Sequence, residues 1–200
     1  MKNKIYIYGA SGHGLVVANI AKKIGYSDII LIDDGDNPYP SFNEIKYNNS
    51  IDIALGIGDN RTREKLFNKV KEYGFNIVTL IEPTAVIADS VTIGEGTVIM
   101  AGVIINPLAK IGKGVILNSS SVIEHENTIE DFVHISPGVA LSGNVTIGRA
   151  THIGVGTSII QGISIGKNSI VGAGSVVIRD IGSNSIAYGN PCRVIRENSE

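Results

Sequence analysis

The 200-residue chain has no tryptophan, a single cysteine and no long apolar run. The one cysteine, Cys192, excludes an internal disulfide and fits a reducing cytoplasm. No apolar stretch approaches the roughly 20 residues that cross a bilayer, and the first residues lack the apolar core of a secretory signal. The formal net charge of −2, without a run of one sign, argues against a dedicated nucleic-acid or membrane-surface protein. We therefore expect a cytoplasmic globular protein.

A strict internal repeat follows residue 80, in a chain that is rich in glycine, with 24 residues. Every sixth residue from position 81 to position 177 is aliphatic, and the series ends at Ser183. Its members are Ile81, Ile87, Ile93, Ile99, Ile105, Ile111, Leu117, Ile123, Ile129, Ile135, Leu141, Ile147, Ile153, Ile159, Ile165, Val171 and Val177. A period of six fits neither an amphipathic helix nor a simple alternating strand. It predicts short strands joined by tight corners, each placing one large aliphatic residue inward.

Small or β-branched residues lie two positions before most of these aliphatics, on the same face of the strand. They are Ala85, Thr97, Ser121, Thr151, Thr157, Ser169 and Ser175. Three such strands form an 18-residue triangular coil, and stacked coils bury a continuous core. We predict a parallel β-helix over residues 81–200, with residues 18 apart side by side.

The residues just before the inward aliphatics point outward and distinguish three faces. The Ile81 face carries Val98, Ile116, His134, His152 and Ile170. The Ile87 face carries Val86, Ile104, Val122, Ala140, Ser158 and Val176, and the Ile93 face carries Thr92, Lys110, Thr128, Thr146 and Ser164. Small residues such as Ala101 and Gly102 form the edge between the first two faces, which are apolar. Two different apolar faces that meet head to tail close into a ring, so we predict a homotrimer.

Residues 1–80 are expected to form a separate α/β domain. Apolar runs predict strands at 4–8, 28–32, 51–57 and near 77–80, and helices at 15–24 and 61–73. This alternation is typical of a parallel sheet of Rossmann-like type. We predict a nucleotide-binding domain over 1–80 and a β-helix domain over 81–200.

The first predicted strand runs into Gly9-Ala-Ser-Gly-His-Gly14 and then a helix. Glycines there let backbone N–H groups approach phosphate at the helix N-terminus, although the spacing is GxxGxG and not the GxGxxG dinucleotide motif. Asp33 and Asp34 follow the second strand about twenty residues on, where an acidic residue typically holds ribose hydroxyls. Because the unit is half the size of a dinucleotide domain, it suits UDP better than NAD.

Histidines at the outer rims of the apolar faces are the candidates for catalysis. His125 lies between Glu124 and Glu126 at a corner, and a nearby carboxylate makes an imidazole more basic, which suits a general base. In the predicted ring, His125 of one chain would lie in a cleft near His134 of the next. A zinc site built from His125, His134 and His152 across an interface is an alternative, because a catalytic zinc needs about three protein ligands.

The chain resembles the PglD/NeuD-type hexapeptide-repeat sugar acetyltransferases. The motifs are Tyr6-Ile-Tyr-Gly-Ala-Ser-Gly-His-Gly14, Leu117-Asn-Ser-Ser-Ser-Val-Ile-Glu-His-Glu126 and Gly189-Asn-Pro-Cys-Arg193. The resemblance covers nearly the whole chain and is nearest to UDP-4-amino-sugar N-acetyltransferases of the bacillosamine pathway. It implies a left-handed β-helix, a homotrimer, acetyl-CoA as co-substrate and no metal. At the tail, Cys192 and Arg193 replace the usual small residue and lysine.

The resemblance also implies roles for individual residues. His125 would be the general base, and Glu126 would raise its basicity. Contacts to the UDP-sugar would come from Ser11, Gly12, His13, Asp33, Asp34 and Gly58, with Asn118 at the acceptor amine. The acetyl-CoA groove would be lined by His134, Gly143, Val155 and Ala173.

We expect direct transfer of the acetyl group to the 4-amino group of a UDP-linked amino-dideoxy sugar, with His125 as base. Gly143 is one 18-residue step from His125, so its N–H is the candidate donor to the oxyanion. The alternatives within the same fold are O-acetylation of a sialic acid and N-acetylation of a GDP-linked amino sugar. A scaffold protein that binds the nucleotide without chemistry is a further alternative.

Overall fold

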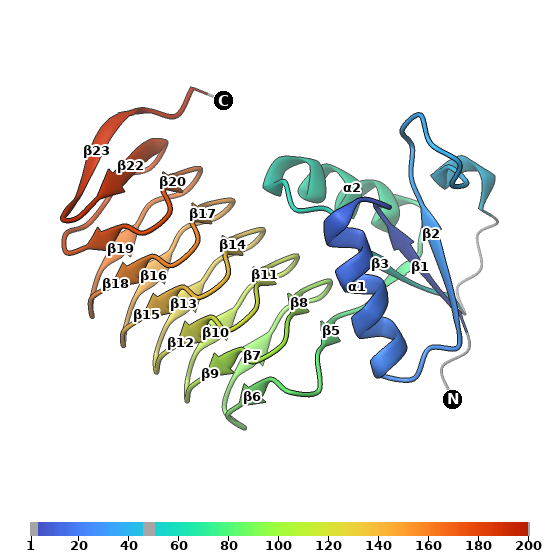
Figure 1. Ribbon diagram of the computed structural model, residues 1–200, viewed down its shortest axis with the longest axis horizontal. Coiled ribbons are helices and arrows are strands. Elements are labelled where there is room, and N and C mark those ends of the chain that lie inside the picture. Colours follow the sequence, from blue (N-terminus) through green and yellow to red (C-terminus); the bar gives the residue numbers. More distant parts are fainter. Residues whose placement is uncertain (1–3, 46–50, 200) are drawn as a thin grey trace.

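The computed structural model describes residues 4–45 and 51–199, so Met1 to Asn3 of the predicted first domain and Glu200 lie outside the described residues. The chain forms an N-terminal α/β part, which we call the cap, followed by a parallel β-solenoid (Figure 1). Within the described ranges, no helix combines the length and apolar character that crossing a membrane requires.

The cap is a four-stranded parallel sheet with the strand order β2-β1-β3-β4. Its elements are β1 (Lys4–Tyr8), α1 (Gly12–Lys23), β2 (Asp28–Ile32), the 3-10 helix η1 (Phe42–Glu44), β3 (Asp52–Leu55), α2 (Asn60–Glu72) and β4 (Asn76–Ile77). The predicted strands at 4–8 and 28–32 are confirmed, and the third strand is shorter than predicted. Helix α1 begins three residues before the predicted start, because Gly12 and Gly14 are helical despite the low helix propensity of glycine.

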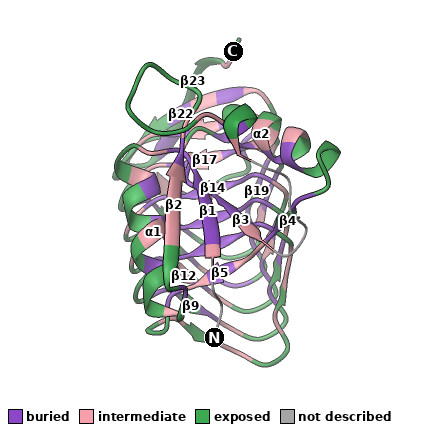
Figure 2. Cartoon of the chain, turned by 90° about the vertical axis from the view of Figure 1, so that its right-hand side faces the viewer, coloured by how far each residue is buried: buried purple, intermediate pink, exposed green. Residues whose placement is uncertain are grey.

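Side chains of the central strand β1 alternate between the two layers of the cap. Ile5 and Ile7 pack with helix α1, whereas Tyr6 and Tyr8 pack with Phe67 of helix α2. Figure 2 shows the buried strand β1 beside the partly exposed β2. The sheet is thus covered on both sides, as parallel sheets require.

The solenoid follows the predicted six-residue repeat closely. Between Leu80 and Val177 every strand is two residues long, and its second residue is one of the predicted inward aliphatics. The strands pair in parallel with partners 18 residues away, as in Ile116↔His134 and His134↔His152. The inward residues from Ile99 onward are buried and form one continuous core.

The strands lie in three sheets, which define the three faces of the solenoid. The cap face consists of β5 (Leu80–Ile81), β8 (Val98–Ile99), β11 (Ile116–Leu117), β14 (His134–Ile135), β17 (His152–Ile153) and β20 (Ile170–Val171). The open face consists of β6 (Val86–Ile87), β9 (Ile104–Ile105), β12 (Val122–Ile123), β15 (Ala140–Leu141), β18 (Ser158–Ile159) and β21 (Val176–Val177). The polar face consists of β7 (Thr92–Ile93), β10 (Lys110–Ile111), β13 (Thr128–Ile129), β16 (Thr146–Ile147) and β19 (Ser164–Ile165). An antiparallel hairpin, β22 (Ser185–Gly189) and β23 (Cys192–Glu197), extends the cap face.

The structure corrects the prediction that both apolar faces are free for neighbouring subunits. Val98 and Ile116 on the cap face are 2% and 0% exposed, because they pack against Ile7 and Val17 of the same chain's cap. The open face stays uncovered, with Val86 64% and Ile104 38% exposed. The cap face therefore anchors the cap through its first coils, whereas the open face stays exposed.

Candidate active site

The glycine loop between β1 and α1 places free backbone donors at the edge of the cap. Ser11 is the N-cap residue of α1, but its hydroxyl makes no capping hydrogen bond. The first intrahelical bond of the turn runs from Leu15 N to Ser11 O, so the N–H groups of Gly12, His13 and Gly14 precede it. Ser11 and Gly12 are exposed, so this helix end can receive an anionic group such as phosphate.

The glycines of this loop have different physical roles. A Cβ atom on Gly14 would lie 1.8 Å from the Gly9 carbonyl oxygen, and Gly56 packs against the same two residues. Gly12, in contrast, has open space where its Cβ would be. Gly9 and Gly14 therefore allow close backbone packing, and Gly12 is the one that leaves room for a ligand.

This difference gives a stability prediction. We expect Gly14→Ala to lower the free energy of unfolding by about 1–3 kcal/mol, as overpacking does. Gly12→Ala is expected to leave it unchanged or slightly raise it, since alanine favours the helix. Thermal melts of the two variants against the parent protein check this, and equal melting temperatures would contradict it.

The predicted acidic pair lies beside this loop but is already bonded within the cap. Asp33 accepts hydrogen bonds from Ala10 N at 2.8 Å and from Gly35 N at 2.9 Å, and these bonds lower the pKa of its carboxyl. Asp34 accepts from the Tyr8 hydroxyl and from Lys69 Nζ. Both carboxylates thus shape the rim of the loop, and Asp33 remains partly exposed beside it.

Two adjoining cavities open at this rim. One, of about 350 Å³, is lined by Tyr8, Gly9, Asp33, Asp34, Gly35, Ile57, Thr62, Lys65 and Leu66. The other, of about 330 Å³, is lined by Ala10, Ser11, Asp33, Gly35, Asp36, Asn37 and Tyr39. Each falls within the range of about 300–1,000 Å³ that is usual for small-molecule sites.

His13, at the start of α1, meets the cap face of the solenoid. Its ring centroid lies 6.4 Å from that of His134. His134 contacts Gly58 O through Nδ1 at 3.2 Å and Asn118 Nδ2 through Nε2 at 3.3 Å. His13, Gly58, Asn118 and His134, all predicted site residues, are therefore brought together at the cap–solenoid junction.

The electrostatics of this junction keep its histidines neutral. Burial lowers the pKa of His13 to about 4, and the nearby Arg63 guanidinium adds to the effect. Burial, His152 and Arg63 together lower the pKa of His134 to about 3. His13 Nε2 is buried and has no hydrogen-bond partner among the described residues.

The His125 corner, between the open and polar faces, presents an exposed imidazole. His125 Nδ1 lies 3.0 Å from Glu126 Oε2, and the two side chains are 58% and 56% exposed. Of the two flanking acids, only Glu126 contacts the ring, because Glu124 accepts from Asn106 Nδ2 at 2.9 Å. A hydrogen on Nδ1 that points at Glu126 leaves Nε2 free to accept a proton.

Gly143 lies directly against this imidazole, as the 18-residue step predicts. A Cβ atom on Gly143 would lie 2.5 Å from His125 Cε1 and 2.6 Å from Nε2. The Gly143 N–H has no acceptor among residues 4–45 and 51–199, as is usual at this position of the turns. A backbone donor and the free ring nitrogen therefore share one small region.

One chain does not bring all the predicted site residues together. Val155 and Ala173 are exposed at the corner between the cap and open faces, where Gly174 N donates to Val155 O. The His125 corner is the vertex of the triangular coil opposite the cap face. His125 and the glycine loop thus lie on opposite sides of the same chain.

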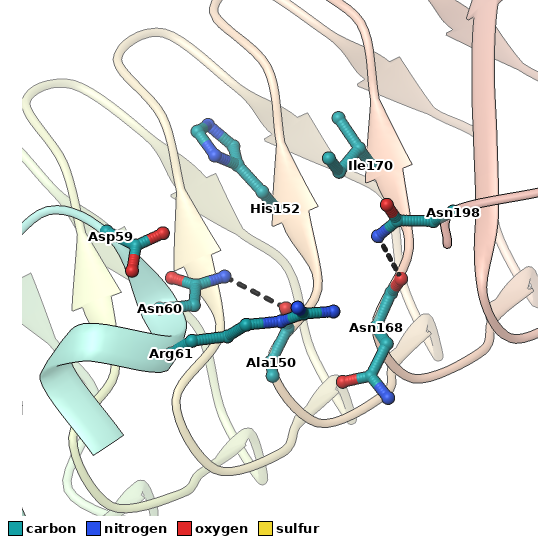
Figure 3. Close-up of a pocket in the computed structure, with 8 residues that line it drawn as sticks. All are labelled: Asp59, Asn60, Arg61, Ala150, His152, Asn168, Ile170 and Asn198. Atoms are coloured by element: carbon teal, nitrogen blue, oxygen red, sulfur yellow. Dashed lines mark hydrogen bonds between the residues drawn. The ribbon is translucent and has the colours of Figure 1, made fainter. Parts of the chain in front are cut away.

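A smaller cavity lies on the cap face between the start of α2 and the last coils (Figure 3). Its lining residues are Asp59, Asn60, Arg61, Ala150, His152, Asn168, Ile170 and Asn198. Asn60 Nδ2 donates to Ala150 O and Asn198 Nδ2 donates to Asn168 O across it. Its volume of about 120 Å³ is too small for a nucleotide.

Two of the three candidate zinc ligands, His134 and His152, already have hydrogen-bond partners within one chain. His134 and His152 stack with centroids 4.7 Å apart, and His152 Nε2 is bonded to Ser136 Oγ at 2.8 Å. Because three of their four ring nitrogens already have partners, these rings are poorly placed as metal ligands. In the part of the chain that the structure describes, no three His, Cys, Asp or Glu side chains are grouped for metal binding.

Sequence reasoning missed one residue at the junction, Arg63. It lies on the buried side of α2 with Phe67 and Val70, and its own side chain is 1% exposed. Arg63, Phe67 and Val70 stand at positions i, i+4 and i+7, which share one face of a helix. This spacing predicts that Arg63 lies on the same buried face as the two apolar residues.

Comparisons with known proteins find similar chains over nearly the full length of this one. The family model described as the PglD N-terminal domain matches residues 4–70. The acetyltransferase domain of PglB from Neisseria gonorrhoeae, solved with acetyl coenzyme A, is 34% identical, with 96% of this chain and 98% of that chain covered and a TM-score of 0.89. A variant of perosamine N-acetyltransferase from Caulobacter crescentus, solved with CoA and GDP-perosamine, is 32% identical, with 97% of each chain covered and a TM-score of 0.89. WeeI from Acinetobacter baumannii is 30% identical, with 96% and 100% covered and a TM-score of 0.86.

Proposed function

The chain belongs to the PglD/NeuD-type hexapeptide-repeat sugar acetyltransferases and is an acyltransferase, and from this premise we propose that it acetylates the 4-amino group of a UDP-linked amino-dideoxy sugar with acetyl-CoA. The observation that carries the proposal is the meeting of the glycine loop with the Asn118–His134 pair at the junction of cap and solenoid. A diphosphate at the N-terminus of α1 would place its sugar near that pair.

In the proposed reaction, the acceptor nitrogen attacks the thioester carbonyl of acetyl-CoA. The C–N bond forms, and the oxyanion of the tetrahedral intermediate accepts a hydrogen bond from the Gly143 N–H. The amine proton moves to His125 Nε2. The C–S bond then breaks, and the CoA thiolate leaves and takes up a proton from His125. Glu126 holds the ring through Nδ1, and no covalent enzyme intermediate is needed.

We further propose a homotrimer in which the His125 corner of one subunit completes the cap-side site of the next. The separation of His125 from the glycine loop within one chain supports this arrangement, because the reaction needs both sets of residues. The exposed apolar open face and the corner of small residues supply a surface for a head-to-tail contact, which closes into a ring. Acetyl-CoA would lie in the groove beside Val155 and Ala173. We place this activity in the cytoplasm, in keeping with the single free cysteine.

A GDP-linked amino sugar is the second candidate acceptor, because a perosamine N-acetyltransferase with GDP-perosamine bound is similar over 97% of both chains. The test is CoA-thiol release from acetyl-CoA with a matched panel of UDP- and GDP-linked 4-amino sugars and a sialic acid. We expect the UDP-linked sugars to have the highest kcat/KM. A preference for the GDP sugars would reject the UDP assignment, and release with the sialic acid alone would reject N-acetylation.

A further inference from the structure

The guanidinium of Arg63 is buried where the cap meets the solenoid, and it bonds to both. Nε donates to Gly114 O at 2.7 Å and Nη2 to Phe132 O at 2.9 Å, both in turns of the solenoid. Nη1 donates to Gly58 O at 3.0 Å in the cap. Among the described residues no carboxylate forms an ion pair with Arg63. Burying a charge against neutral acceptors is costly, so this position calls for a reason beyond packing.

The Gly58 carbonyl connects Arg63 to His134. It accepts from Arg63 Nη1 at 3.0 Å and lies 3.2 Å from His134 Nδ1. Because a carbonyl oxygen only accepts, the contact with His134 places a hydrogen on Nδ1 and leaves Nε2 without one. The neutral state of this ring agrees with that tautomer.

Asn118 is oriented by the other nitrogen of the same ring. Its Nδ2 donates to His134 Nε2 at 3.3 Å, and its Oδ1 accepts from Ser119 N at 2.8 Å. The two bonds distinguish the nitrogen of the Asn118 amide from its oxygen and fix the orientation of the amide plane. The second hydrogen on Nδ2 therefore points in one defined direction. The opposite tautomer of His134 would present a hydrogen to Asn118 Nδ2 and break this arrangement.

We propose that Arg63 is a positioning residue for acetyl transfer, which fixes the Gly58 carbonyl, selects the Nδ1-protonated tautomer of His134 and so orients Asn118 toward the acceptor. The role of Asn118 in this inference rests on the proposed function, whereas the tautomer of His134 does not depend on it. Arg63 itself touches no substrate in this scheme. The same guanidinium also contributes hydrogen bonds across the contact between cap and solenoid.

Arg63→Met tests the proposal, with Arg149→Met as the matched control. Arg149 also joins cap and solenoid, through Glu64, but contacts neither Gly58 nor His134. We expect Arg63→Met to lower kcat by about 10- to 100-fold, the scale of a small misplacement, with a smaller change in the KM for acetyl-CoA. Arg149→Met is expected to stay within about twofold of the parent protein, as exposed ion pairs contribute little.

The tautomer is read directly by ¹⁵N NMR of histidine-labelled protein without substrate. The parent protein and Arg149→Met should show His134 protonated on Nδ1, and Arg63→Met should show a mixture or the other form. Loss of activity in Arg63→Met with an unchanged tautomer would overturn the proposal, as would equal activity in the two variants. If Arg63→Met does not fold, Arg63→Lys is measured in its place, because lysine keeps the charge but cannot bridge Gly58 and Gly114 as the guanidinium fork does. Because the NMR arm needs no acceptor, it stands even if the proposed acceptor is wrong.

Discussion

Replacing His125 by alanine is expected to lower kcat for acetyl transfer by about 10²- to 10⁴-fold, the contribution of a general base. The reason is geometric: Nδ1 is held by Glu126 at 3.0 Å, and Nε2 is the free nitrogen beside Gly143. The KM for acetyl-CoA should change much less than kcat. Steady-state CoA-thiol release with the preferred acceptor measures both constants.

The His125 variant has a useful control in its neighbour. Glu126→Gln keeps the size of the side chain but removes the charge, so we expect a smaller fall in kcat than in His125→Ala. Since His125 is exposed, its loss should leave the melting temperature unchanged. Activity close to that of the parent protein would reject His125 as the base.

Mixed oligomers show whether His125 acts across a subunit boundary. His125→Ala and Asn118→Ala chains, each of low activity alone, are co-expressed with different tags and purified as mixed assemblies. If the site is shared, some interfaces combine an intact His125 with an intact Asn118, and activity returns. No recovery in verified mixed assemblies would reject the shared site.

Gly143→Ala is expected to lower kcat by at least about 10²-fold, the scale of a misplaced catalytic group. The added methyl group would lie 2.5 Å from His125 Cε1, which no ordinary contact allows, so the imidazole must move. Because Gly143 is not among the glycines with positive φ, alanine suits its backbone. The loss should therefore appear in kcat rather than in stability.

Gly182→Ala is the matched control for this variant. It also lies in a turn of the solenoid, has no positive φ, and an added Cβ would meet only Ser185 Oγ at 4.0 Å. We expect full activity and an unchanged melting temperature for Gly182→Ala. If Gly143→Ala retains parent activity, a fixed position of the His125 ring is not needed for transfer.

The sequence by itself determined the solenoid, because an aliphatic residue at every sixth position specifies which side chains point inward. Each aliphatic residue from Ile81 to Val177 ends a two-residue strand, and the series stops where Ser183 cannot fill the core. The same repeat predicts the neighbours along the solenoid, such as Gly143 beside His125. Local pattern sufficed because each coil contacts mainly the next one.

Only the tertiary structure decided what covers the cap face. Val98 and Ile116 have the same apolar character as Val86 and Ile104, so the sequence could not tell a face that binds the cap from one left open. The burial of Arg63 against the turns at Gly114 and Phe132 likewise depends on contacts between distant segments. Such contacts follow from how two domains fit together, and that fit has no period along the chain from which it could be read.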